Sequence, residues 1–109
     1  MWRNTYVPYM EPEPFGVKHD AEKPDYSLTP WRALEEVVAV LTYGAKKYSR
    51  DNWQYVEPFK ERYIAAAFRH VVAYARGEKI DPESGLHHLA HAATCLLYLI
   101  ERDKNDDQT

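Results

Sequence analysis

The sequence has little cysteine and no long hydrophobic segment, and both absences narrow the class of protein. A single cysteine, Cys95, excludes a disulfide within the chain and suits a reducing compartment. No apolar run approaches the roughly 20 residues of a membrane span, and the N-terminus lacks the apolar core of a signal peptide. We therefore expect a soluble cytoplasmic protein with no membrane partner.

The chain also lacks an excess of basic residues. Its 14 Lys and Arg residues are outnumbered by 17 Asp and Glu residues, which gives a net charge of −3. Because nucleic-acid binding usually needs a basic face, we expect no nucleic-acid partner. A chain of 109 residues is sufficient for one domain, and short helical chains commonly associate to bury more surface. A homo-oligomer is therefore expected.

Segments with the alternating period of a strand are absent, and the prolines are unevenly distributed. Five of the seven prolines lie within residues 1–30, and this density excludes a continuous helix or a central strand there. We expect an irregular arm rich in proline and tyrosine over residues 1–29, and a frayed tail over residues 103–109. Between them, residues 30–102 are expected to form a compact all-α bundle of three to four helices.

Local signals predict where the helices begin and end. Thr29 suits the N-cap of a helix over residues 30–48, whose first residue is a proline that needs no N–H partner. Gly77 suits the end of a second helix over residues 59–76.

A third helix is expected to follow Asp81 and Pro82, which read as an N-cap and a first helical position, and to end near Arg102. With about 100° per residue, its apolar stripe lies opposite His88, His91 and Cys95. That stripe consists of Leu86, Leu89, Ala93, Leu96, Leu97 and Ile100.

The first helix has an apolar stripe of its own, which is expected to enter the core. Its members are Trp31, Leu34, Val37, Val38, Leu41, Ala45 and Tyr48. Val40 and Tyr43 are apolar on the far side, which indicates a second buried contact for this helix.

Carboxylates and imidazoles gather at the start of the third helix. His88 and His91 are neighbours at an i, i+3 spacing, and Asp81 and Glu83 lie just upstream. Carboxylates and imidazoles are the side chains that form metal-assisted hydrolytic sites. Asp81 also has a structural explanation as a helix cap, and His88 and His91 have one as partly buried histidines. Oxygen ligands favour Mg²⁺ or Mn²⁺, whereas imidazoles favour Zn²⁺ and other later metals.

Other polar and aromatic residues have two interpretations each. Lys46 and Lys47 suit the dipole at the end of the first helix and are also placed to meet phosphates. Trp53 either stacks on a planar ligand or covers the core. Arg69 belongs to a stripe of arginines that is either solvated or functional.

Several strings, specific in combination, resemble one known family. They are Lys23-Pro-Asp-Tyr-Ser-Leu-Thr-Pro-Trp-Arg-Ala-Leu-Glu-Glu-Val-Val, Leu41-Thr-Tyr-Gly-Ala-Lys-Lys-Tyr48, Asn52-Trp53, Arg69-His70, Gly77-Glu78, Asp81-Pro-Glu-Ser-Gly-Leu and His88-Leu-Ala-His91-Ala-Ala. Over residues 23–101 the chain resembles the phage-type, MazZ-like dATP/dGTP diphosphohydrolases. These belong with the MazG-like all-α nucleoside triphosphate pyrophosphohydrolases.

The resemblance implies an enzyme that hydrolyses a purine deoxynucleoside triphosphate between its α and β phosphates, giving the monophosphate and pyrophosphate. It implies a divalent metal, Mg²⁺ or Mn²⁺, with Zn²⁺ or Co²⁺ as alternatives, and assembly as a dimer or tetramer. A phage-encoded member would work in the cytoplasm of the host cell.

The chain departs from the wider MazG pattern, which has an E-E-x-x-E run on one helix and an E-x-x-D step on another. Ala39 stands where the third acid of the run would be, and His88 and His91 stand at the two acidic positions of the step. The expected metal ligands are accordingly Glu35, Glu36, His88 and His91.

The remaining roles follow from the chemistry of phosphoryl transfer. We expect His70, Asp81 or Glu83 to orient or deprotonate the attacking water. The residues expected to bind substrate are Lys46, Lys47 and Arg69 at the phosphates, and Asn52 and Trp53 at the base.

Two other functions fit the same residues. One is a metal-dependent deoxynucleotide phosphomonoesterase that uses His70, Asp81, His88 and His91. The other is a non-catalytic helical interaction module in which the histidines and acids are structural.

Overall fold

A computed structural model describes residues 16–107 of the chain, which divides into two compact units, Met1–Pro30 and Trp31–Thr109. The division falls where the sequence predicts the arm to end and the bundle to begin. The expected arm over residues 1–15 and the end of the tail, residues 108–109, lie outside the described residues.

The described part of the first unit is irregular, as expected. Residues 16–30 contain no α-helix and no strand, and their one regular element is a 3-10 turn, η1 (Tyr26–Leu28). Asp25 caps this turn, because its Oδ1 accepts a hydrogen bond of 3.0 Å from the Ser27 N–H. This contact is an Asx turn, in which an aspartate side chain accepts from the backbone two residues further along.

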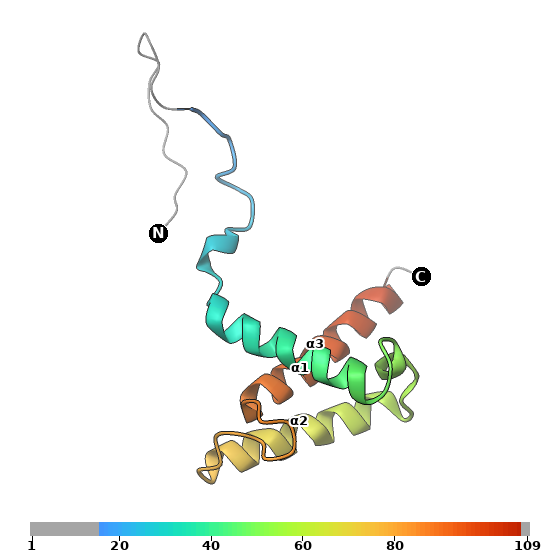
Figure 1. The fold of residues 1–109 in the computed structure, drawn as a ribbon. Helices are drawn as coiled ribbons and strands as arrows, with labels where there is room; N and C mark the ends of the chain where they lie inside the picture. The colour runs from blue at the N-terminus through green and yellow to red at the C-terminus, as the bar shows by residue number, and fades with distance from the viewer. Residues whose placement is uncertain (1–15, 108–109) are drawn as a thin grey trace. The chain divides into compact units, whose positions relative to one another are not determined.

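The second unit is helical, and the all-α prediction is confirmed. It contains α1 (Trp31–Lys47), the 3-10 turn η2 (Asn52–Tyr55), α2 (Phe59–Ala75) and α3 (His88–Asp107). Helix α3 packs against both other helices, more extensively against α2. Figure 1 shows the arrangement of the three helices. None of the helices within residues 16–107 combines the length and hydropathy of a membrane span.

Helices α1 and α2 begin and end next to the expected residues. Gly77, with φ at 101°, terminates α2 as predicted. Its N–H donates to the carbonyl of Tyr74, and the Glu78 N–H reaches back to the carbonyl of Ala73. This paired bonding is the Schellman motif, which needs a left-handed residue that glycine supplies without steric cost.

The predicted start of the third helix at Asp81 and Pro82 is wrong. Residues 78–87 instead form a tight connector, in which Ile80 and His87 pair as an isolated antiparallel bridge. Within it the Asp81 N–H donates to the carbonyl of Leu86 at 2.8 Å. The local Asp-Pro signal is overridden because this cross-turn pairing satisfies the backbone in place of a helical turn.

Helix α3 begins at His88 and ends later than predicted. His87 is its N-cap, since the His87 Nδ1 accepts the Leu89 N–H at 3.0 Å. The helix continues to Asp107, so the predicted end at Arg102 and the frayed tail from residue 103 are wrong for the described residues. Arg102 anchors this part of α3, donating to the carbonyl of Gln54 at 2.8 Å.

The helix faces that enter the core of the single chain differ from the expected ones. On α3 the buried side chains are His88, Ala90, Ala92, Thr94 and Cys95. The predicted core stripe is largely outside, with Leu96 and Ile100 exposed by 50% and 55%. On α1, Val40 is buried at 6% exposure, whereas Trp31 is 55% exposed. Both apolar stripes therefore face outward in the single chain.

Burial should make the single thiol unreactive. The Cys95 side chain is buried in α3, and burial raises its pKa to about 11. Because the thiolate is the reactive form, we expect Cys95 in the native protein at pH 8 to react with a disulfide reagent about a hundredfold more slowly than in denaturant. Equal rates in the two conditions would contradict the packing described for α3.

Candidate functional site

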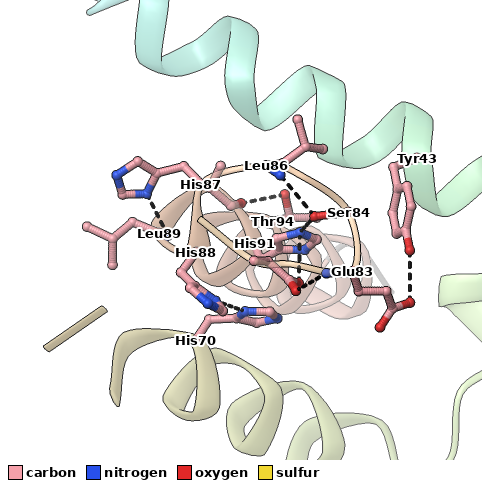
Figure 2. A network of polar contacts seen from close by, with 12 residues as sticks. Tyr43, His70, Glu83, Ser84, Leu86, His87, His88, Leu89, His91 and Thr94 are labelled. Atoms are coloured by element: carbon pink, nitrogen blue, oxygen red, sulfur yellow. Dashed lines mark hydrogen bonds and ion pairs between the residues drawn. The ribbon is translucent and has the colours of Figure 1, made fainter. Parts of the chain in front are cut away.

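Side chains from three elements converge where the connector enters α3. His70 comes from α2, Asp81 from the connector, and His88 from the first turn of α3. The Nδ1 atoms of His70 and His88 lie 2.9 Å apart, as Figure 2 shows. One possible ligand atom from each of the three residues lies within 4.8 Å of the other two, so the group can hold a metal ion.

His88 is held in a fixed orientation at the centre of this group. Its side chain is buried, and its Nε2 lies 2.7 Å from the Glu78 Oε1. In the neutral tautomer of His88 that donates its Nε2–H to this carboxylate, Nδ1 is unprotonated, so a lone pair points toward His70. The Schellman motif at Gly77 places Glu78 for this contact.

His91 lies one turn further along α3 and covers the group. Its ring stacks on that of His70, with centroids 4.5 Å apart and planes inclined by 11°. Its Nε2 lies 2.7 Å from the Ser84 Oγ and 3.5 Å from the Asp81 Oδ2. Burial lowers the pKa of both His70 and His91, while the Asp81 carboxylate opposes the shift at His91. Burial thus favours neutral imidazoles, the form that binds metals.

The turn of the connector positions Asp81. The Asp81 Oδ1 accepts the Glu83 N–H at 2.9 Å, an Asx turn that leaves Oδ2 to face His91. The Asp81 carbonyl accepts the N–H of Gly85, whose φ of 74° suits a residue without a side chain. The Asp-Pro-Glu-Ser-Gly string therefore folds as a turn that orients a carboxylate.

Glu83, predicted to act on the attacking water, instead links the connector to α1. Its Oε2 accepts a hydrogen bond of 2.8 Å from the Tyr43 hydroxyl (Figure 2) and also pairs with the Lys47 ammonium. These two donors, Lys47 first, hold the pKa of the Glu83 carboxyl below its usual value. Glu83 and Lys47 are therefore paired with each other.

The two predicted acidic ligands on α1 are placed differently. The Glu36 Oε2 accepts the backbone N–H of His87 at 2.9 Å, which puts a negative charge at the N-terminus of α3. Glu35 is exposed. Within the described residues the group that can hold a metal, His70, Asp81 and His88, includes neither glutamate and shares only His88 with the predicted ligand set.

The predicted substrate-binding residues lie around the bundle. Lys46 and Arg69 are exposed on α1 and α2. Asn52 and Trp53 form part of η2, where the Trp53 ring stacks on Tyr98 at 4.4 Å with planes inclined by 7°. Trp53 therefore packs as the core-covering interpretation expects, because Tyr98 occupies one face of its ring.

The sequence places some of this geometry correctly and misses the rest. The i, i+3 spacing puts His88 and His91 on neighbouring turns, as the structure has them. His70 and Asp81 were expected to act on water. No spacing rule in the sequence predicts that they approach His88, because that approach depends on how α2 packs on α3. The Gly77 and Gly85 turns are the available signal, because both glycines have positive φ and mark where the connector changes direction.

Comparison with known proteins gives two matches. The family model described as dATP/dGTP diphosphohydrolase, N-terminal, matches residues 14–109. A protein of Salmonella phage PMBT28 named dATP/dGTP diphosphohydrolase is 40% identical over 97 residues, which covers 85% of this chain and 33% of the relative. The chain thus spans about a third of the length of that curated relative. No solved structure matches.

The contact between Glu36 and α3 predicts a measurable stability effect. Glu36→Ala leaves the His87 N–H without its acceptor, so we expect the free energy of unfolding in urea to fall by about 1–2 kcal/mol. Glu35→Ala, on the exposed neighbouring position, is the matched control and should change it by less than about 0.5 kcal/mol. Equal effects of the two substitutions would contradict the capping role of Glu36.

Proposed function

The chain belongs to the family described as dATP/dGTP diphosphohydrolase, N-terminal, and from this membership we propose that it hydrolyses purine deoxynucleoside triphosphates. The substrates are dATP and dGTP, and the products are the monophosphate and pyrophosphate. The name of the phage relative supports the substrate class. The observation that carries the proposal is the convergence of His70, Asp81 and His88 within the matched region.

The proposed reaction depends on a divalent metal held by His70, Asp81 and His88, and the chemistry of these donors supports it. A bound cation would supply a water of lowered pKa and neutralise charge on phosphate oxygens. Two imidazoles and a carboxylate are established donors for divalent ions. The Asx turn positions the Asp81 carboxylate, and the His91 Nε2 adds a polar contact to its Oδ2 at 3.5 Å.

The other residues have roles that follow from their positions. Lys46 and Arg69 are exposed and are assigned to the phosphates, while Lys47 is engaged by Glu83. We assign the base to the side of the bundle that carries Asn52 and Trp53. Tyr98, which stacks on Trp53, lies two helical turns beyond His91, about 10 Å along the axis of α3.

We also propose that the chain assembles as a homo-oligomer, a dimer or tetramer. The outward apolar stripes support this, because isolated chains rarely leave such continuous apolar surface to water. On α1 and α3 the large side chains of these stripes that are exposed are Trp31, Leu34, Val38, Leu89, Leu96, Leu97 and Ile100. A protein that a phage encodes, as the relative is, would act in the host cytoplasm.

Product analysis tests the proposed reaction. The protein is incubated with each of the eight common ribo- and deoxynucleoside triphosphates and with Mg²⁺, Mn²⁺, Co²⁺ or Zn²⁺, and the products are separated by anion exchange. We expect dATP and dGTP to yield the monophosphate and pyrophosphate. Release of orthophosphate would indicate the phosphomonoesterase instead, and no turnover with any metal would favour the non-catalytic module.

Substitution at the cluster makes this test specific. His91→Ala removes the imidazole that contacts Asp81 and stacks on His70, so we expect at least a hundredfold loss of hydrolysis with an unchanged helical circular dichroism spectrum. His19→Ala changes an exposed histidine of the other unit and should retain activity. Full activity of the His91 variant would remove His91 from the site.

Light scattering tests the proposed assembly. The double substitution Leu97→Glu with Ile100→Glu places two charges in the α3 stripe, and we expect it to reduce the molar mass in solution to that of one chain. Asn105→Glu adds a charge to α3 at a position outside the stripe and should leave the oligomer intact. A monomeric parent protein would contradict the assembly.

A further inference from the structure

We propose that the centre formed by His70, Asp81 and His88 selects a transition-metal ion of the Zn²⁺ or Co²⁺ type over Mg²⁺. This differs from the Mg²⁺ or Mn²⁺ that the family resemblance implies. This inference rests on the proposed function only for the use of the ion in hydrolysis. The binding of the ion is inferred from the positions of the three side chains.

The donor set is the first support. Mg²⁺ prefers six oxygen ligands in a near-ideal octahedron and gives up its waters reluctantly. Imidazole nitrogens suit Zn²⁺ and neighbouring transition metals instead. Here two of the three donors are imidazoles and one is a carboxylate. Three protein ligands with an open fourth position are typical of catalytic zinc sites.

The spacing of the donors is the second support. At a metal–nitrogen distance of roughly 2.0–2.1 Å, two ligands of a tetrahedral ion lie roughly 3.3 Å apart. The Nδ1 atoms of His70 and His88 are already 2.9 Å apart, so a small opening would admit an ion between them. The pair joins two helices, which means that both rings are held by the packing of α2 on α3.

The surroundings of the donors are the third support. Histidine ligands of metals usually donate their second ring N–H to a carboxylate or carbonyl, which fixes the tautomer. The Glu78 Oε1, 2.7 Å from the His88 Nε2, occupies that position. The Asp81 carboxylate is contacted by His91, and both side chains are largely buried, with exposures of 16% and 12%.

A hydrogen-bonded histidine pair is the competing explanation of the 2.9 Å contact. In that case a proton on one Nδ1 bridges to the other, and no cation is bound. The two explanations differ in what the protein does when a metal is offered. A hydrogen-bonded pair would not bind Co²⁺, whereas the proposed centre would bind the ion through both imidazoles.

Metal titration of the full chain tests the inference without any substrate. The protein is stripped with a chelator, and binding of Co²⁺, Zn²⁺ and Mg²⁺ at pH 7.5 is followed by calorimetry and, for Co²⁺, by its visible absorption. We expect one equivalent of Co²⁺ or Zn²⁺ per chain, bound at least a hundredfold more tightly than Mg²⁺. Intense visible Co²⁺ bands would report a four- or five-coordinate site.

Two variants and a matched control assign the ligands. His70→Asn and Asp81→Asn each remove one donor while keeping a side chain that can hydrogen-bond, and the amide oxygen introduced by Asp81→Asn can still accept the Glu83 N–H that forms the turn. We expect each to weaken Co²⁺ binding at least tenfold, with helical content checked by circular dichroism. His87→Asn removes an adjacent histidine but preserves an N-cap acceptor for α3, so its Co²⁺ affinity should match the parent.

The outcomes separate this inference from the proposed reaction. Equal affinity for Mg²⁺ and Co²⁺, or Co²⁺ binding that survives both variants, would overturn the inference even if dGTP is hydrolysed. Selective Co²⁺ binding that both variants weaken would uphold it, and would do so even if no nucleotide is turned over.

Discussion

The close approach of α3 to α2 at His88 and His70 is the constraint on which the candidate centre depends. The side of α3 that carries His88 also carries two small buried residues, Ala92 and Cys95, which are only 4% and 8% exposed. Because such residues keep the helices near each other, the two imidazoles meet at 2.9 Å instead of being separated by larger side chains. The buried Thr94 hydroxyl adds no unsatisfied group, since it donates to the carbonyl of Ala90.

The connector converts this helix contact into a polar site. Each of its three acidic residues has a different partner: Glu78 binds His88, Asp81 faces His91, and Glu83 accepts from Tyr43 and Lys47 of α1. Two glycines with positive φ bound the turns that make these contacts possible. The acidity of the segment therefore reflects three defined contacts, which fix the connector to α1 and α3.

Local signals predicted the parts of the fold that depend on a few neighbouring residues. The end of α2 follows from Gly77, which acts through its own backbone conformation. Thr29, predicted as the N-cap of α1, instead ends η1, where its N–H donates to the carbonyl of Tyr26. The start of α3 was missed because the pairing of Ile80 with His87 competes with the Asp81 helix signal and wins. A helical wheel shows which side chains lie together but not which side faces the core. It grouped His88 with His91 correctly and yet turned the apolar stripe of α3 the wrong way for a single chain. The convergence of His70 with Asp81 is a tertiary contact, and no local spacing encodes it.

Anomalous diffraction from a crystal of the full chain grown with Co²⁺, measured on both sides of the cobalt absorption edge, would locate the bound ion. We expect one strong anomalous peak per chain, within bonding distance of the His70 and His88 Nδ1 atoms and the Asp81 carboxylate. A peak coordinated by Glu35 and Glu36 of α1, with His70 and His88 still hydrogen-bonded to each other, would contradict it.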